Sequence, residues 1–272
     1  MSISVRNTHF CCACVLALSV AVTVVKADDD PSPTDVPEAN PARPTVSTPA
    51  TLPPAGYIQF ETGSLGATTS PEFTTRVGVG NVTKLAVDSR LEFFVQTEPY
   101  VHSTFGSTPA EIHPGEVFVG TQVVALQGQE AVPTISVSYI RRLYESPAPE
   151  LDLGTYRQSG AILISNDMRR FHVDSNFIVL EQTDGGVRRA QLAQTLSVSH
   201  PLGRFTIAGE IWHFTQPFLR SNAVGLLWAV SYPLRRNLVV DAGFDHGLTS
   251  TSTHWESFVG FTYLLPKKLW KD

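Results

Sequence analysis

The sequence AVGLLWAVSY, residues 223–232, alternates large and small side chains. The large apolar residues of the alternation are Val224, Leu226, Trp228, Val230 and Tyr232. Successive side chains of a β-strand point to opposite faces of the sheet, whereas an amphipathic helix repeats its apolar residues at intervals of three and four. The segment therefore predicts a strand with one large apolar face and one face of mostly small residues.

The next segment, residues 237–246, repeats the alternation with charge, because Asp241 and Asp245 fall on the face opposite Leu238 and Phe244. Similar alternation recurs back to residue 57, and no later stretch has sustained helical spacing. The predicted strands are residues 57–63, 73–80, 85–95, 115–126, 132–141, 156–166, 170–182, 189–200, 204–215, 222–232, 237–246 and 255–264. The sequence thus predicts an all-β protein with about twelve strands.

The connections between these strands alternate in length. Short turns are expected at residues 81–84, 127–131, 167–169, 201–203 and 233–236, and generally longer loops at 64–72, 97–114, 142–155, 183–188, 216–221 and 247–254. Outer-membrane up-and-down barrels have short periplasmic turns, longer outside loops and an even number of strands. We therefore predict an antiparallel transmembrane β-barrel over residues 56–265, with a secreted soluble β-sandwich as the alternative.

The N-terminal region has a different composition. Residues 1–27 contain Arg6, an apolar run from Phe10 to Val25 that is short for a membrane-spanning helix, and a small-residue cleavage motif, which predicts a secretory signal peptide rather than a membrane anchor. Residues 28–55 are rich in proline, threonine and serine, which predicts an extended, disordered linker. A short tail, residues 266–272, follows the barrel, so either Tyr263 or Trp270 is expected to serve as the C-terminal assembly signal.

Composition excludes several classes of function. The formal net charge is −5 and no block of five or six like charges occurs, so we expect no nucleic-acid partner. All three cysteines, Cys11, Cys12 and Cys14, lie in the predicted signal peptide, and no spacing of metal ligands follows. We therefore expect neither a metal site nor a cofactor.

Several segments resemble a known family. Residues 73–78 and 89–92, residues 115–120, and the run from Phe205 to Leu265 with its SYPL and NLVVD motifs are similar to the phenol-degradation meta-pathway (MetA-type) transporter family. The resemblance covers most of residues 56–265. It implies an outer-membrane channel-like barrel associated with the uptake of aromatic or hydrophobic compounds.

The polar face of the strands supplies the candidate functional residues, because polar side chains of a membrane barrel project into its lumen. The lumen-facing candidates are Arg76, Asp88, Arg90, Glu92, Arg157, His172, Asp174, Glu210, Asp241 and Asp245. These residues could select solutes, or pair across strands and fill the interior. A hydrolytic site is disfavoured, because His172 and Ser175 would point to opposite faces of one strand.

The sequence therefore predicts a Gram-negative outer-membrane barrel, exported through its signal peptide, that acts as a non-enzymatic channel for passive uptake of small aromatic or hydrophobic solutes. A sealed structural or surface-interaction barrel acting through its extracellular loops, and an outer-membrane hydrolase, are the alternatives. The expected partners are outer-membrane lipid, lipopolysaccharide, the barrel assembly machinery and a solute whose identity the sequence leaves open.

Overall fold

The computed structural model describes residues 36–129, 132–219 and 221–270. These residues form one antiparallel sheet of thirteen strands. The strands are β1 (Ile58–Thr68), β2 (Thr75–Ala86), β3 (Leu91–Thr104), β4 (Glu111–His113), β5 (Val117–Leu126), β6 (Thr134–Tyr144), β7 (Tyr156–Met168), β8 (Phe171–Asp184), β9 (Val187–Leu202), β10 (Phe205–Phe214), β11 (Ala223–Arg235), β12 (Leu238–Gly247) and β13 (Trp255–Leu264). Among the described residues, no helix is long and apolar enough to span a membrane.

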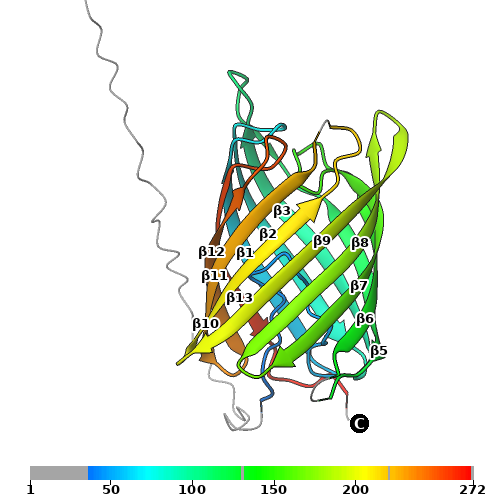
Figure 1. Cartoon of the computed structure of the whole chain (residues 1–272), viewed down its shortest axis with the longest axis vertical. Helices are drawn as coiled ribbons and strands as arrows, with labels where there is room; N and C mark the ends of the chain where they lie inside the picture. The colour runs from blue at the N-terminus through cyan, green and yellow to red at the C-terminus, as the bar shows by residue number, and fades with distance from the viewer. Residues whose placement is uncertain (1–35, 130–131, 220, 271–272) are drawn as a thin grey trace, which may run out of the picture.

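Twelve of these strands close into a barrel (Figure 1). Strand β1 pairs with β2 on one side and with β13 on the other, which removes the free edges of the sheet. The thirteenth strand, β4, is a short addition that pairs only with the end of β3. The predicted all-β, twelve-stranded antiparallel barrel is confirmed, with one extra strand.

Some predicted boundaries are wrong. The predicted turn at residues 81–84 lies inside β2, and the chain turns instead at residues 87–90. Glycines are common in turns, and Gly78 and Gly80 directly precede the predicted turn. In the structure, the pairing of β2 with β3 shifts register between Val79 and Asn81, so the glycines lie at a β-bulge. Strand β3 consequently reaches Thr104, into the loop predicted at 97–114.

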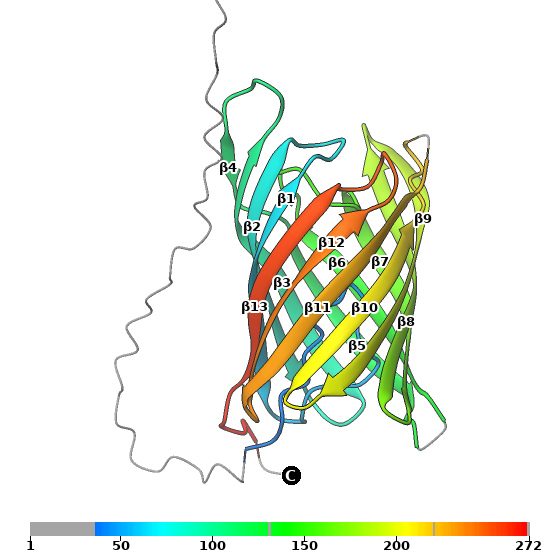
Figure 2. The same cartoon turned by 60° about the vertical axis from the view of Figure 1, so that its left-hand side comes forward.

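The two ends of the barrel differ. Short turns at residues 169–170, 203–204 and 236–237 lie at the end where the described N-terminal and C-terminal segments also lie (Figures 1 and 2). Longer connections occur at the other end, with one exception between β8 and β9. There the turn consists only of Gly185 and Gly186, with φ angles of 53° and 81°, a conformation that glycine adopts without steric cost.

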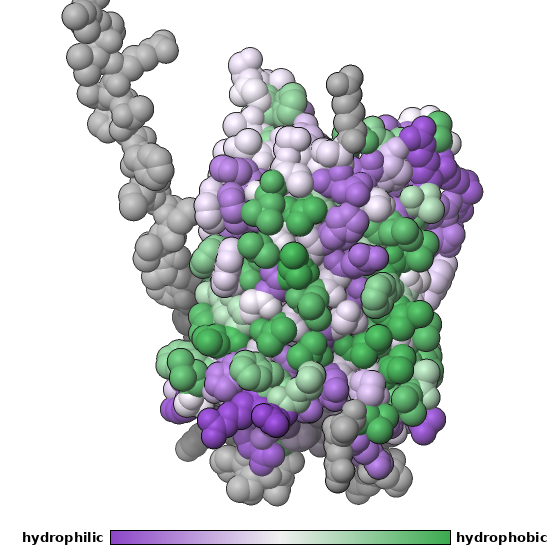
Figure 3. Space-filling model, viewed as in Figure 1, coloured by the Kyte–Doolittle hydropathy of each residue, from purple (hydrophilic) through white to green (hydrophobic). Residues whose placement is uncertain are grey.

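The faces of the wall follow the alternation of the sequence. Trp228, Val230 and Phe244 are exposed on the outside, whereas Asp241 and Asp245 are buried on the inside. On the face shown in Figure 3, apolar side chains accordingly gather in a broad band across the middle of the barrel. A soluble sandwich would have the opposite arrangement, with apolar side chains inside, so the soluble alternative does not describe this barrel.

Candidate functional site in the barrel lumen

The N-terminal segment enters the barrel. Residues 36–55, here called the N-terminal plug, enter the lumen from the end with the short turns and run inside it behind the strands (Figures 1 and 2). Ser47 and Ala50 are fully buried there. This differs from the disordered linker expected for residues 28–55: its last twenty residues contact the wall, while residues 28–35 and the predicted signal peptide lie outside the described residues.

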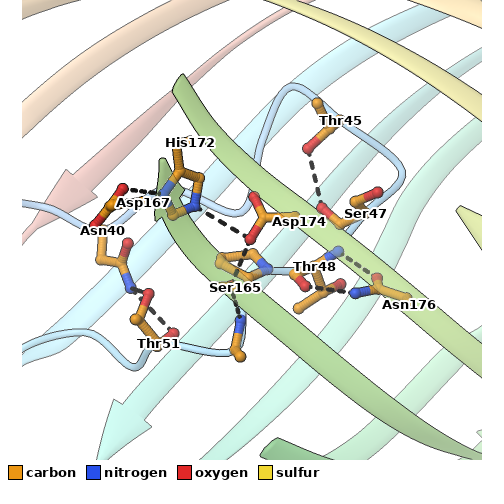
Figure 4. Close-up of polar contacts among 12 residues, drawn as sticks. Asn40, Thr45, Ser47, Thr48, Thr51, Ser165, Asp167, His172, Asp174 and Asn176 are labelled. Atoms are coloured by element: carbon orange, nitrogen blue, oxygen red, sulfur yellow. Dashed lines mark hydrogen bonds and ion pairs between the residues drawn. The ribbon is translucent and has the colours of Figure 1, made fainter. Parts of the chain in front are cut away.

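Polar side chains of the wall bind the backbone of the plug. Glu210 of β10 accepts hydrogen bonds from two consecutive amides, Val46 N and Ser47 N, both at 2.7 Å. Asn176 of β8 accepts from Thr48 N at 2.7 Å and donates to Thr48 O at 2.9 Å, as a neighbouring strand would (Figure 4). An irregular buried segment needs such partners for its backbone groups, and the lumen supplies them.

The same pattern extends along the plug. Further bonds join Asn40 to Gln59, Ala42 N to Glu61 Oε1, Pro49 O to Gln122 Nε2, Ala50 N to Ser165 Oγ and Ala50 O to Ser136 Oγ, at distances of 2.5 to 3.2 Å. Prolines 44 and 49 have no amide hydrogen to satisfy. The prolines reduce the number of backbone amides that need a partner, and the polar side chains of the lumen bind the remaining backbone groups.

One cation of the plug occupies a notch in the wall. Arg43 pairs with Asp241 of β12 at 3.2 Å, beside Gly63 of β1 and Gly260 of β13, which face each other across the strand pair. A Cβ atom at Gly260 would lie 2.7 Å from Arg43 Nε, and one at Gly63 would also collide with the guanidinium. These glycines therefore leave the space that the Arg43 side chain fills.

The opposite end of the lumen is covered by the connection between β6 and β7, residues 145–155, here called the outer loop. Arg76 Nε donates to Pro149 O at 2.8 Å, Thr253 N donates to Asp152 Oδ1 at 2.6 Å, and Gln216 Nε2 donates to Asp152 O at 2.5 Å. Leu153 packs against the buried cluster that contains Trp212. The outer loop is thus folded inward and held by several strands and loops.

A cavity of about 270 Å³ lies between the two segments. Its lining includes Arg43 and Thr48 of the plug and Leu153 of the outer loop, so both segments bound it. Its apolar lining comprises mainly Phe94, Ile140, Leu153, Tyr156, Leu163, Ile178, Leu180 and Phe214, and its charged lining comprises Arg43, Glu61, Lys84 and Glu92. We call this space the chamber.

The predicted lumen residues occupy three different places. Arg76, Glu92, Glu210, Asp241 and Asp245 are buried. Three others lie outside this interior: Asp88 and Arg90 are exposed in the turn between β2 and β3, because that turn is six residues later than predicted, and Arg157 lines a surface hollow at the outer rim with Arg142, Glu145 and Asp184.

His172 and Asp174 lie near the turn end, close to the plug. His172 Nδ1 is 2.7 Å from Asp167 Oδ1 and its Nε2 is 3.2 Å from Asp174 Oδ1 (Figure 4). Ser165 donates to Asp174 at 2.5 Å rather than contacting His172. Because both ring nitrogens have carboxylate partners, His172 does not activate a serine in this arrangement.

Several residues that line the site were not predicted from sequence. Gln59 and Gln122 are uncharged and are absent from the predicted lumen residues, and Lys84 falls in the predicted turn at residues 81–84. Lys84 forms a buried ion pair with Glu61, its Nζ atom 2.6 Å from Glu61 Oε1. Gln59, Lys84 and Gln122 each lie on the polar face of their own strand, and this alternation was the available signal.

Acidic residues dominate the buried charges. Among the described residues, the buried acidic side chains are Glu61, Glu92, Glu116, Asp152, Glu210, Asp241, Asp245 and Glu256, whereas the buried basic ones are Arg76 and Lys84. In the outer connections, burial raises the pKa of Glu150 to about 8 and that of Glu116 to about 7, although Arg142 lowers the latter. Burial also raises the pKa values of Glu72 and Asp152.

Comparisons with known proteins support the fold. No family model matches the chain, and no curated protein is significantly similar. Among solved structures, the COG4313 outer membrane channel from Pseudomonas putida F1 has 10% identity and a TM-score of 0.62, covering 84% of this chain and 100% of that one. The NanC porin has 10% identity and a TM-score of 0.54, covering 75% and 100%. Membership in the MetA-type family stays a prediction, and the chain has the fold of outer-membrane channels and porins.

Proposed function

We propose that this protein is a gated channel of the Gram-negative outer membrane that takes up small solutes with aromatic or hydrophobic bodies. The exposed apolar side chains of the strands suit the hydrocarbon layer, and the end with short turns and both described termini faces the periplasm. The predicted signal peptide provides export. The apolar lining of the chamber supports the solute class.

The plug carries this proposal. It is held by hydrogen bonds from polar side chains to its backbone and by the Arg43–Asp241 ion pair. Water can replace such polar contacts at a net cost of about 1 kcal/mol each, whereas withdrawal from an interlocked apolar core would expose apolar surface. The plug is therefore suited to leave the lumen and return.

Membrane insertion is tested by extracting the full-length protein from outer membranes and comparing its gel mobility with and without heating. We expect a heat-modifiable band. Recovery as a soluble periplasmic protein would contradict the proposed location.

Channel activity is tested in planar bilayers with the full-length protein and with a variant lacking residues 40–51. We expect small or brief currents from the full-length protein and larger, longer openings from the variant. The inward fold of the outer loop favours a second candidate, a sealed barrel that acts through its surface loops. Absence of current from both proteins would support that candidate.

A further inference from the structure

One carboxylate of the chamber has an oxygen atom without a hydrogen-bond partner. Glu92 of β3 is 2% exposed, and its Oε2 atom has no hydrogen-bond partner. Lys84 attracts the Glu92 carboxylate electrostatically, but its ion pair is with Glu61, and Arg43 pairs with Asp241. No cation of the described residues lies within 4.0 Å of the Glu92 carboxylate as an ion pair. A buried carboxylate in this position favours a ligand that donates a hydrogen bond or carries positive charge.

The apolar part of the chamber begins beside this carboxylate. Glu92 and Phe94 project from the same inner face of β3, two residues apart. Phe94 lies over Gly120 of β5, where a Cβ atom would collide with its ring. A ligand with its donor at Glu92 would therefore place its body toward Phe94 and the aliphatic residues Ile178 and Leu180 of β8.

The size and net charge of the chamber narrow the ligand further. A cavity of roughly 150 Å³ binds benzene, so a chamber of about 270 Å³ accommodates one ring with a short side chain. The acidic groups at the chamber are Glu61, Glu92 and Asp241, the partner of Arg43, and the basic groups are Arg43 and Lys84. The chamber therefore has one more acidic group than basic groups. This excess disfavours a carboxylate ligand and favours a cation.

We infer that the chamber is a binding site for a small, largely apolar molecule that carries one protonated amine, with the ammonium group bound by Glu92 and the apolar body packed against Phe94. The inference rests on the proposed channel function and specifies the class of solute that binds inside the channel. The site is formed jointly by the wall, the plug and the outer loop, so the ligand is enclosed between the two segments.

The inference is tested by titrating the full-length detergent-solubilised protein with four probes of similar size in a calorimeter. The probes are 2-phenylethylamine, 2-phenylethanol, propylbenzene and 3-phenylpropionate. We expect the amine to bind most tightly and the carboxylate most weakly, with roughly a tenfold or greater ratio, since Glu92 attracts an ammonium group and repels a carboxylate.

Variants locate the binding group. Glu92→Gln keeps the side-chain shape and is expected to abolish the preference for the amine over the alcohol. Glu116→Gln is the matched control, because Glu116 is also buried and also has a carboxylate oxygen without a partner, but it does not line the chamber. Ile178→Trp, which fills the chamber, is expected to weaken all probes and provides a second test if Glu92→Gln does not fold.

The outcomes separate this inference from the channel function. Equal affinities for the amine and the carboxylate, or unchanged amine affinity in both Glu92→Gln and Ile178→Trp, would overturn the amine site even in a protein that conducts. In a third outcome, the protein binds the amine through Glu92 and yet carries no current in bilayers. That result would support the amine site and contradict the channel function.

Discussion

The N-terminal plug and the outer loop occupy opposite parts of the same lumen, and similar chemistry holds them. In both, side chains of other elements bind the backbone of an irregular segment. Their attachments differ: the outer loop is fixed to strands at both ends, whereas the plug is continuous with the wall only through β1. We therefore expect the plug to be able to leave the lumen entirely, and the outer loop only to swing at its mouth.

Their electrostatics differ as well. The plug contributes a cation, Arg43, to an acidic wall. The outer loop instead brings Glu150 and Asp152 close to other acidic groups, including Glu72 and Glu256. Binding of the plug is thus aided by opposite charge, whereas closure of the outer loop depends on keeping carboxyl groups neutral or hydrogen-bonded.

The largest expected effect is that of Glu210→Ala on the plug. The substitution removes the acceptor of Val46 N and Ser47 N, and an unsatisfied buried amide costs about 1 to 3 kcal/mol. We expect the open probability in planar bilayers to rise at least ~10-fold, since 1.4 kcal/mol corresponds to a factor of ten. Glu210→Gln, which keeps one acceptor oxygen, should have a smaller effect; equal currents from both variants and the wild type would contradict this role.

A second prediction concerns pH at the outer loop. The closed loop contains Glu150, whose pKa of about 8 exceeds the ordinary 4.5 because of burial and the nearby Glu116, Glu98 and Glu72, partly offset by Arg76. Closure is therefore fully stabilised below about pH 4.5 and weakens as the pH rises through about 8. Raising the pH on the loop side alone from 6 to 9 should increase channel openings several-fold.

Glu150→Gln provides the control for that experiment, because its side chain stays neutral. We expect its openings to depend less on pH than those of the wild type. If the variant responds to pH as strongly as the wild type, titration of Glu150 does not release the outer loop.

A smaller effect is expected at the Arg43 notch. Gly63→Leu would displace the guanidinium and weaken its ion pair with Asp241, a partly exposed contact worth up to about 1 kcal/mol. Open probability should rise by up to about fivefold, and proteinase K should cut the plug faster. Gly66→Leu on the same strand is the matched control, since no atom lies within 4 Å of a Cβ there. Equal proteolysis of both variants would exclude the notch as an anchor.

The smallest effect is expected from Arg90→Ala. Arg90 is exposed in the turn between β2 and β3 and is not part of the lumen wall. The free energy of unfolding should change by less than about 0.5 kcal/mol, and single-channel conductance should not change. A clear change in conductance would indicate that Arg90 faces the lumen, as predicted from the sequence.

The sequence predicted the barrel better than the site. Alternation correctly placed the exposed Trp228 and Phe244 opposite the buried Asp241 and Asp245, because the strand period of two is a local property. Such a pattern does not reveal β-bulges. Because of the bulge near Gly80, the turn lies at residues 87–90, six residues after the predicted turn at 81–84. That error also led to the wrong placement of Asp88, Arg90 and Lys84.

What the sequence determined by itself is the antiparallel barrel, its polar interior and its apolar exterior, since each follows from neighbours along a strand. The tertiary structure alone decided that residues 36–55 enter the lumen and bind its wall. Some of their contacts join residues far apart in the sequence, such as Ser47 and Glu210, which are 163 positions apart. An irregular, proline-rich segment also has no periodicity from which its contact partners could be predicted. The chamber depends on the same long-range contacts, because the wall, the plug and the outer loop become neighbours only after the barrel closes.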